Sequence, residues 1–564
     1  MASIRGSGSR SGEVVDSRIR TADIPDVRVH FSSRFTIILT CLGSVVGTGN
    51  IWRFPRVVAN NSQDEGGLVF LMVWVLFLLF WSIPMLLIEY STGRYTQHGV
   101  IDSFRQLMSE KFAWCGGWIM LVNFMIASYY SVVLGWCFYY FIHSCANSLP
   151  DNAEDSRRIF REYAEDSYWP VLTHAVAILL AGLSIAKGVR TIEKVSMLLV
   201  PCFILLILFT FVWSLTRDHA DYGITYLFTP HWESFAEPRV WVDALSQNAF
   251  DTGAGMGIMI IYSSYMTRAN GSVRYATLLP SLNNLVSLIA GMTVFSTVFS
   301  TLIASRPYMT QQQILEILQD SGPGSTGLTF IWIPVLFQTV GTFGRALAIM
   351  YFLCLSFAGL TSLISNMEQA AVTFDDFGLP RKFSMPLTVA LVYSAGLMSA
   401  LNINILTNQD FVWGFALVIS GMMLQGMVIY YGVSNFRTIV VNDYGLNDWK
   451  LPKIWEYVIK FIAPIEAVIL IVWWAIDLIS DETQPGVDQW YEFGRETFMI
   501  TIVQWLAVLL IALVPNMLVY WIRHRGTAGE KALLLTSAST SDEFDTTASS
   551  NRKSQASQSL EIRM

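Results

Sequence analysis

About twelve apolar segments of bilayer-spanning length constrain this 564-residue chain more than any other feature of its sequence. A transmembrane helix needs about 20 predominantly apolar residues, and 53% of the chain is hydrophobic while only 14% is charged. The core of a soluble protein cannot absorb that much apolar sequence. The sequence therefore predicts an all-α integral membrane protein. Its apolar segments begin near residues 35, 67, 117, 170, 193, 241, 276, 342, 386, 411, 454 and 499.

The distribution of charge indicates how these segments are oriented. Residues 1–33 are polar and contain no signal-peptide run, so we expect a cytoplasmic N-terminal segment, and an even number of crossings returns the tail to the same side. Basic residues such as Lys187, Arg190 and Lys382 fall on that side, as the positive-inside rule requires. Residues 526–564, rich in Ser and Thr, predict a disordered cytoplasmic tail. We expect a multi-pass protein of the plasma membrane, and the absence of a basic stripe in the sequence argues against nucleic-acid binding.

The first apolar segment is interrupted in its middle. It carries three glycines, an asparagine and an arginine there, namely Gly43, Gly47, Gly49, Asn50 and Arg53. Glycine costs about 1 kcal/mol per helix position relative to alanine, so the helix is expected to unwind here. Inside a membrane, unwound backbone is tolerated only where protein or a cavity covers it. The interruption therefore predicts a binding site.

The sixth apolar segment is interrupted in the same way. Between Gln247 and Gly257 it carries three glycines and the carboxylate Asp251. The first and sixth segments lead two groups of five, and interruptions at corresponding positions favour an inverted-repeat transporter. The alternative is that the glycines only let two helices pack closely, but close packing explains neither Asn50 nor Asp251.

Five motifs carry a resemblance to a known family. They are Gly49-Asn50-Ile51-Trp52-Arg53-Phe54-Pro55, Gly66-Gly67, Pro84-Met85-Leu86-Leu87-Ile88-Glu89, Lys187-Gly188-Val189 and Phe357-Ala358-Gly359-Leu360-Thr361-Ser362. Together they resemble the neurotransmitter:sodium symporter family, from about Arg28 into the last segments. The resemblance implies a 5+5 inverted repeat with broken helices 1 and 6. Helices 1–5 would lie within 34–216, helices 6–10 within 241–437, and helices 11 and 12 within 454–522.

The resemblance also implies two sodium sites. A monovalent cation stripped of water needs about five or six oxygen ligands, which backbone carbonyls at a helix break and polar side chains supply. The first site would use carbonyls and hydroxyls of Gly43, Val46, Ala358, Thr361 and Ser362. The second would use Asn50, Asn283 and the carbonyl of Val45.

Asp251 stands where many members of this family have Thr or Ser. An intramembrane carboxylate is costly and therefore points to function. Asp251 could ligate sodium, replace the charge of the chloride ion that animal members bind, or take up a proton. Gln247 and Ser287 match the chloride-dependent pattern, whereas Trp74 stands where a tyrosine is usual. We favour the replacement of chloride, and so expect that chloride is not required.

The first interruption indicates the class of substrate. Monoamine carriers of the family have an aspartate at the position of Gly47, and glycine leaves that space to a substrate that brings its own carboxylate. The amides around Thr48 and Gly49 and the hydroxyl of Tyr130 would bind this carboxylate. Asn366 replaces a usual aliphatic residue, which predicts a medium to large neutral amino acid with a polar end. The other residues implied for the pocket are Val45, Ile126, Phe250, Gly253, Met256 and Ser362.

Two ion pairs would act as gates, Arg53 with Asp410 on the outside and Arg28 with Asp376 on the inside. The predicted function is sodium-coupled symport of neutral amino acids by alternating access in a lipid bilayer. An enzyme is not expected, because none of the seven histidines sits with an acid at ligand spacing deep in an apolar segment. Two alternatives remain: a nontransporting sensor or accessory protein on the same fold, and a transporter of another small carboxylated solute.

Overall fold

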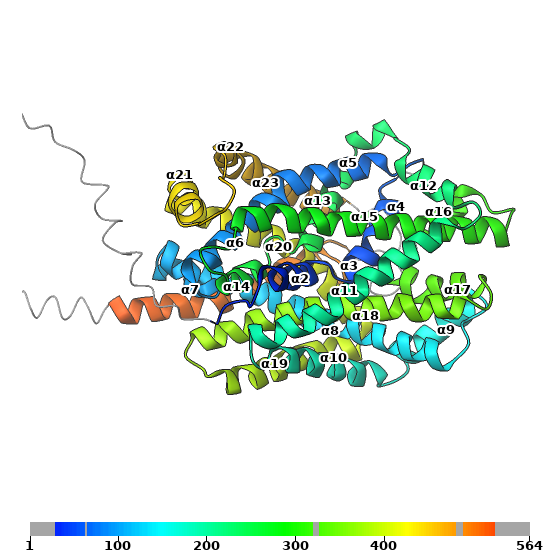
Figure 1. Ribbon diagram of the computed structural model, residues 1–564, viewed down its shortest axis with the longest axis horizontal. Coiled ribbons are helices and arrows are strands. Elements are labelled where there is room, and N and C mark those ends of the chain that lie inside the picture. Colours follow the sequence, from blue (N-terminus) through cyan, green and yellow to red (C-terminus); the bar gives the residue numbers. More distant parts are fainter. Residues whose placement is uncertain (1–28, 63–64, 320–325, 481–488, 525–564) are drawn as a thin grey trace, which may run out of the picture.

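The chain forms a bundle of helices (Figure 1). The computed structural model describes residues 29–62, 65–319, 326–480 and 489–524, and within these ranges it contains helices and no strand. Nine of the described helices are long and apolar enough to cross a membrane, which confirms the predicted fold class. They are α5, η1 and α6 (Leu68–Phe77, Leu78–Ser82, Ile83–Thr96), η2 and α8 (Glu110–Phe112, Ala113–Ala146), α11 (Val189–Leu215), α15 (Ser272–Ser305), α18 (Gly344–Asp376), α19 (Arg381–Leu401), α20 (Ile403–Tyr431), α22, η7 and α23 (Ile454–Tyr457, Val458–Ile462, Ala463–Ser480), and Phe498–His524.

The other three predicted spans are short or broken. They are the first, α2, α3 and α4 (Arg34–Val45, Thr48–Ile51, Arg53–Asn60); the fourth, α10 (Trp169–Ile185); and the sixth, α13 and α14 (Pro238–Thr252, Ile258–Ser264). The helix α10 has 17 residues and is bent by 70° against α9 (Ala153–Ala164). The interruptions predicted in the first and sixth spans are therefore present.

Backbone geometry explains both interruptions. After α2, Val46 has φ −78° and ψ 95°, and Gly47 has φ −112° and ψ −166°, so both residues are extended. After α13, the backbone takes positive φ at Gly253 (69°), Gly255 (96°) and Gly257 (75°). Glycine adopts this left-handed region at no steric cost. The glycine cluster is thus what allows the sixth span to unwind.

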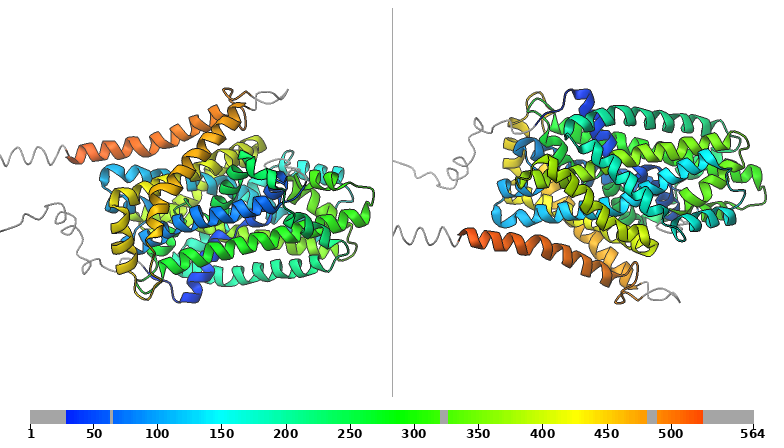
Figure 2. Two further views of the ribbon diagram at one scale, coloured as in Figure 1. Left: turned by 90° about the horizontal axis from the view of Figure 1, so that it is seen from above. Right: turned by 90° about the horizontal axis from the view of Figure 1, so that it is seen from below.

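The helices are arranged in two groups around the broken spans. In Figure 1, α8, α10, α18 and α19 lie on one side and α5, α6 and α15 on the other, with α2 and α14 between them. In α8 and in α18, 78% of the residues in the most apolar part of the helix are buried. In the span that ends with α23 and in the last helix, the buried share is 22%. Figure 2 shows this last helix along the edge of the bundle. The outer helices thus present apolar surface to lipid, and the inner ones enclose the broken spans.

Short helices occupy several connections between the spans. For example, Asn152 caps α9 by accepting a hydrogen bond from Asp155 N at 2.9 Å. The other short helices are α7 (Val100–Leu107), α12 (Ala220–Phe228), η3 (Trp232–Ala236), α16 (Gln311–Gln319), η5 (Leu328–Trp332), α17 (Ile333–Gln338), α21 (Val433–Asn435) and η6 (Phe436–Asp443). Most of the N-terminal segment predicted over 1–33, and the tail predicted over 526–564, lie outside the described residues.

Candidate functional site

A cavity lies where the two broken spans meet α8 and α18. It is lined by Ser44, Val45, Gly47, Gly49, Asn50, Ile126, Tyr130, Phe250, Asp251, Gly253, Met256, Ile258, Ser362 and Asn366. Nine of the ten residues implied for the substrate pocket are among them. The tenth, Thr48, borders the cavity through Tyr130, because its backbone N–H and its hydroxyl lie 3.2 and 3.0 Å from the Tyr130 hydroxyl oxygen.

Gly47 lies in the wall of the cavity, between Tyr130 and Ser362. A Cβ atom at this position would lie 2.8 Å from Ser362 Oγ and 3.1 Å from the Tyr130 hydroxyl oxygen. A side chain would therefore displace both hydroxyls. Glycine leaves the Tyr130 and Ser362 hydroxyls side by side at the cavity, and Ser362 Oγ is buried without a hydrogen-bond partner among the described residues.

Four of the predicted polar residues form a buried network between the breaks. The Asn50 side-chain nitrogen donates to Asn283 Oδ1 at 2.9 Å and to Ser287 Oγ at 2.7 Å. Ser287 Oγ in turn donates to Asp251 Oδ2 at 3.2 Å. The other carboxylate oxygen, Oδ1, is buried and has no hydrogen-bond partner among the described residues. An unsatisfied buried carboxylate oxygen beside two amide side chains fits a monovalent cation, because such a group is costly unless a cation or a donor meets it.

The groups predicted for the first sodium site lie at the end of α2 and on α18. A Cβ atom at Gly43 would lie 3.3 Å from Thr361 Cβ, so the two helices approach closely at this point. Thr361 Oγ1 donates to the Ala358 carbonyl at 2.9 Å. Together with the unpartnered hydroxyl of Ser362, this places three of the predicted ligand groups on consecutive turns of α18 beside the end of α2. Carbonyl and hydroxyl oxygens of this kind fit a sodium ion.

The predicted remnant of an anion site is only partly assembled. Gln247, one turn before Asp251 on α13, lies beside that carboxylate, and Ser287 bonds to it. The backbone carbonyl of Trp74 accepts a hydrogen bond from the Asn248 side chain of α13 at 2.7 Å. Its ring packs against Phe54, with centroids 4.6 Å apart. Trp74 is thus a packing residue at this position.

Glu89 is a functional candidate that the motif contained but to which no role was assigned. This fully buried carboxylate on α6 accepts hydrogen bonds from Gly255 N at 2.9 Å and Met259 N at 3.1 Å. It therefore satisfies backbone donors that unwinding of the sixth span leaves free. The signal in the sequence was an intramembrane carboxylate, which by itself points to function.

The predicted outer gate is not formed as an ion pair in this structure. Arg53 and Asp410 do not pair within 4.0 Å, and Nε and Nη1 of Arg53 have no hydrogen-bond partner among the described residues. The guanidinium instead lies 4.7 Å from the centroid of the Phe250 ring, which lines the cavity. A cation is attracted to an aromatic face, so the Phe250 ring stabilises Arg53 in this position. Closure of the pair remains a prediction.

Only one residue of the predicted inner gate, Asp376, lies among the described residues. Arg28 lies outside the described residues, while Asp376 Oδ2 accepts from Gly99 N at 2.6 Å. A second ionic cluster, which the sequence did not predict, lies on the same end of α18. There the buried Glu368 pairs with Arg381 and accepts from the Tyr265 hydroxyl at 2.6 Å. The N-terminal side of α2 is held nearby, because Ser32 N donates to Glu193 Oε1 at 2.9 Å and Phe31 N donates to the Tyr265 carbonyl at 3.1 Å.

Comparisons with known proteins identify the family of this chain. Residues 28–167 and 162–525 match the profile described as SNF, the Sodium:neurotransmitter symporter family. The chain is 27% identical over 458 residues to YhdH, an uncharacterized sodium-dependent transporter of Bacillus subtilis (strain 168), covering 78% of this chain and 96% of that protein. It is 27% identical over 481 residues to the sodium-dependent serotonin transporter of Drosophila melanogaster, covering 76% and 74%.

A solved structure extends the likeness to three dimensions. The crystal structure of MhsT in complex with L-phenylalanine superposes with a TM-score of 0.68 at 26% sequence identity, covering 79% of this chain and 99% of that chain. Well over half of the present chain matches the family profile, and its helices are those of a multi-span membrane protein. The chain therefore belongs to the sodium:neurotransmitter symporter family and is a sodium-dependent transporter of a small molecule, not an enzyme.

Proposed function

We propose that this transporter is a symporter of neutral amino acids and that Asp251 makes chloride unnecessary for its cycle. The observation that carries the proposal is the arrangement of polar groups around Gly47 in the cavity wall. The hydroxyls of Tyr130 and Ser362 converge there, and because the Tyr130 oxygen accepts from Thr48, its own hydrogen is left to donate to a substrate. A side chain at residue 47, such as the carboxylate that a monoamine would need, would displace both hydroxyls. A substrate that supplies its own carboxylate complements these donors.

The remainder of the cavity supports a neutral side chain of medium to large size. Ile126, Phe250 and Met256 supply an apolar lining, and Met is adaptable in shape. Gly253 adds no bulk to this lining, and a Cβ atom there would only reach van der Waals contact with Met256 Sδ, at 3.8 Å. The buried Asn366 Oδ1 has no hydrogen-bond partner among the described residues, which favours a side chain with a polar end. The phenylalanine bound to the similar MhsT is consistent with a cavity of this kind.

Two sodium ions would drive the cycle. One would bind among Asp251, Asn50, Asn283 and the Val45 carbonyl, and the other among the groups of Gly43, Val46, Ala358, Thr361 and Ser362. In each proposed site one buried oxygen, Asp251 Oδ1 or Ser362 Oγ, has no hydrogen-bond partner among the described residues. Sodium would satisfy these oxygens and hold the two breaks in place.

The fixed charge of Asp251 supports independence from chloride. Ser287 and Gln247, which would donate to an anion, instead face this carboxylate. A second anion at the same place would be repelled. Direct ligation of sodium and uptake of a proton are the two other roles that we retain for Asp251, and the experiments below separate them.

Transport would proceed by alternating access. We propose that the bundle containing the two broken spans rocks against the scaffold of the other helices, driven by sodium binding. The two repeats, within 34–216 and 241–437, would each contribute one broken span to this bundle. Arg53 and Asp410 would close the outer side, and Arg28 and Asp376 the inner side. The protein would lie in the plasma membrane with both termini in the cytoplasm.

Uptake into proteoliposomes tests this function. The purified protein is reconstituted, and accumulation of amino acids from a pooled labelled mixture is measured with an inward sodium gradient and with choline in place of sodium. We expect sodium-dependent accumulation of neutral amino acids. Substrate binding without accumulation would instead indicate a sensor or accessory protein, and accumulation of only non-amino carboxylates would contradict the assigned substrate class.

A further inference from the structure

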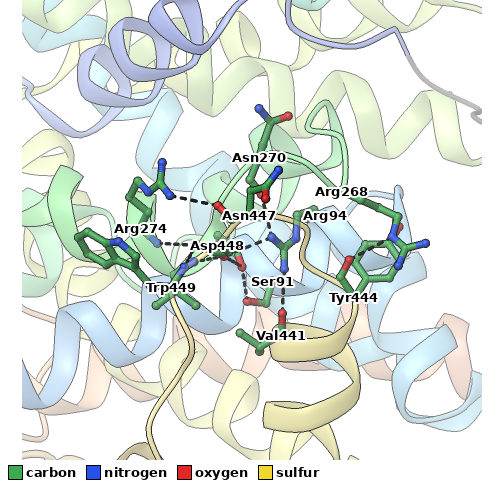
Figure 3. Close-up of polar contacts among 12 residues, drawn as sticks. Ser91, Arg94, Arg268, Asn270, Arg274, Val441, Tyr444, Asn447, Asp448 and Trp449 are labelled. Carbon is green, nitrogen blue, oxygen red and sulfur yellow. Dashed lines mark hydrogen bonds and ion pairs between the residues drawn. The ribbon is translucent and has the colours of Figure 1, made fainter.

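The end of α6 that lies away from the first break carries a buried ion pair outside the cavity. Arg94 Nη1 lies 3.4 Å from Asp448 Oδ2, and the two side chains are 0% and 4% exposed. Asp448 belongs to the connection between η6 and α22, and we call residues 444–449 the strap. Figure 3 shows the strap side chains meeting Arg94 of α6 and the residues that connect α14 to α15.

Asp448 caps the start of α15. Its carboxylate accepts hydrogen bonds from Val273 N at 2.9 Å and from Arg274 N at 3.2 Å. The residue at the N-cap position itself is Gly271, which has no side chain to serve as a cap. A Cβ atom there would lie 2.6 Å from Asp448 Oδ1. In many helices an Asp or Ser at the N-cap position accepts hydrogen bonds from the first backbone N–H groups. Here Gly271 leaves room for the Asp448 carboxylate, from a distant part of the chain, to accept them instead.

Arg94 joins the same carboxylate to two further segments. It donates to the Asn270 carbonyl at 2.8 Å and to the Val441 carbonyl at 3.3 Å. Gly445 permits this approach, because a Cβ atom there would lie 3.1 Å from both terminal nitrogens of Arg94. Loss of either charged partner would leave the other buried and unpaired, which is strongly unfavourable.

Backbone contacts fix the strap independently of this ion pair. Leu446 N donates to the Arg268 carbonyl at 2.8 Å, and Arg268 Nε donates to the Tyr444 carbonyl at 3.0 Å. The Arg274 guanidinium donates to the Asn447 carbonyl at 3.1 Å (Figure 3). The strap, the end of α6 and the start of α15 are thus bonded to one another at several points.

The two helices joined in this way are those that hold the candidate sites. Glu89 on α6 binds the unwound part of the sixth span, and α15 carries Asn283 and Ser287. We infer that Asp448 is a positioning residue for transport: it fastens α6, α15 and the strap into one rigid unit that moves as a whole during alternating access. This inference rests on the proposed sodium-coupled function.

Two substitutions weaken the unit without touching the cavity. Asp448→Asn removes the charge that faces Arg94, and Gly271→Ala inserts a methyl group against the Asp448 carboxylate. Both should raise the sodium concentration for half-maximal uptake by about fivefold or more, as expected for loss of coupling between distant sites. The substrate KM at saturating sodium should stay unchanged, and Asp448→Glu should recover part of the sodium affinity. Matched controls are Asp443→Asn, an exposed acid of η6, and Gly426→Ala, where a Cβ atom meets nothing within 4 Å.

Two results would contradict the inference. One is an equal change in the half-maximal sodium concentration and in the substrate KM, and the other is an unchanged half-maximal sodium concentration in both variants. The first result would indicate a general loss of folded protein. The second would show that the strap contributes nothing to the position of α15.

A disulfide between the strap and the α14 to α15 connection tests whether they move together. Arg268→Cys and Leu446→Cys are combined in a Cys145→Ala background, because Cys145 is exposed, and the backbones at 268 and 446 already share a hydrogen bond. If the unit is rigid, oxidation should leave sodium-driven uptake unchanged, with disulfide formation verified by thiol labelling. Arrest of uptake on oxidation and recovery on reduction would overturn the inference.

Hydrogen exchange separates failure of the inference from failure of the proposed function, because it needs no substrate. Exchange is measured on the detergent-purified protein in sodium and in choline. Amides of residues 266–271 and 444–449 should respond to sodium with the same sign, and Asp448→Asn should abolish the response of the strap. A wild-type strap that does not respond, while residues 266–271 do, would refute the rigid unit even if no transported substrate is found.

Discussion

Ser287 donates a hydrogen bond to Asp251, and this 3.2 Å contact joins α15 to the α13 side of the sixth-span break. The same hydroxyl accepts from the Asn50 side chain at 2.7 Å, so one serine connects both broken spans. Asp251 keeps its other oxygen buried and unpartnered within the described part of the chain. An acidic side chain therefore lies where the two interruptions meet.

The hydroxyl pair on α18 supplies the first prediction. Thr361→Val combined with Ser362→Ala removes two oxygens from the proposed sodium site at Gly43, and should weaken sodium binding by several kcal/mol, because a dry cation site offers no replacement. The sodium dependence of uptake measures the effect. Ser356→Ala is the matched control, since that hydroxyl donates only within its own helix, to the Phe352 carbonyl at 2.7 Å. Sodium-dependent uptake that survives the double substitution would show that this site is assigned wrongly.

Tyr130 tests recognition of the substrate carboxylate. Tyr130→Phe should weaken substrate binding by about 1–3 kcal/mol through the lost hydrogen bond, and amino alcohols should compete poorly with the parent amino acids in the wild type. Competition by unlabelled compounds in the uptake assay measures both effects. Tyr140→Phe serves as the control on the same helix, because the Tyr140 hydroxyl is buried and has no hydrogen-bond partner among the described residues. Equal inhibition by an amino acid and by its decarboxylated amine would exclude carboxylate recognition.

Glu89 should stabilise the break in the sixth span. Glu89→Gln replaces one acceptor by a donor that faces a backbone N–H, and should lower the stability of the protein by about 1–3 kcal/mol. Thermal unfolding in detergent measures the change, with Glu154→Gln on the exposed face of α9 as the control. An unfolding midpoint equal to that of the wild type would show that the two hydrogen bonds to Gly255 and Met259 contribute little.

A proton-linked role for Asp251 makes a separate prediction. If this carboxylate takes up and releases a proton in each cycle, Asp251→Asn should make uptake insensitive to pH while chloride stays irrelevant. Our account expects instead that Asp251→Asn loses activity at every pH, because the fixed charge is gone. The pH profile of uptake by the two proteins distinguishes these outcomes.

The breaks in the first and sixth spans could be predicted from local sequence, because glycines and polar residues within an apolar segment have no other good explanation. The residues around the cavity followed from the family resemblance, and the structure brings nine of the ten together. By contrast, the partners of Glu89, Glu368 and Asp448 could not be predicted. They depend on contacts between segments up to 354 positions apart in the chain, which carry no local pattern.

The gates mark a second limit of prediction from sequence. Residue type identified Arg53 and Asp410 as partners, but whether they meet depends on the conformation of the transporter. In this structure the Phe250 ring holds the Arg53 guanidinium instead. The Glu368 and Arg381 pair could not be recognised from the motifs, because Glu368 lies beyond the motif that ends at Ser362 and its partner is on the next helix.

Replacement of chloride by gluconate in the proteoliposome assay tests most directly the claim that Asp251 supplies a fixed negative charge. We expect wild-type uptake, driven by a sodium gradient, to be the same in both anions, and Asp251→Ser to lose uptake that chloride partly restores, because Gln247 and Ser287 can then donate to the ion. A raised sodium requirement in Asp251→Ser without rescue would indicate a direct sodium ligand. Dependence of the wild-type protein on chloride would contradict the account.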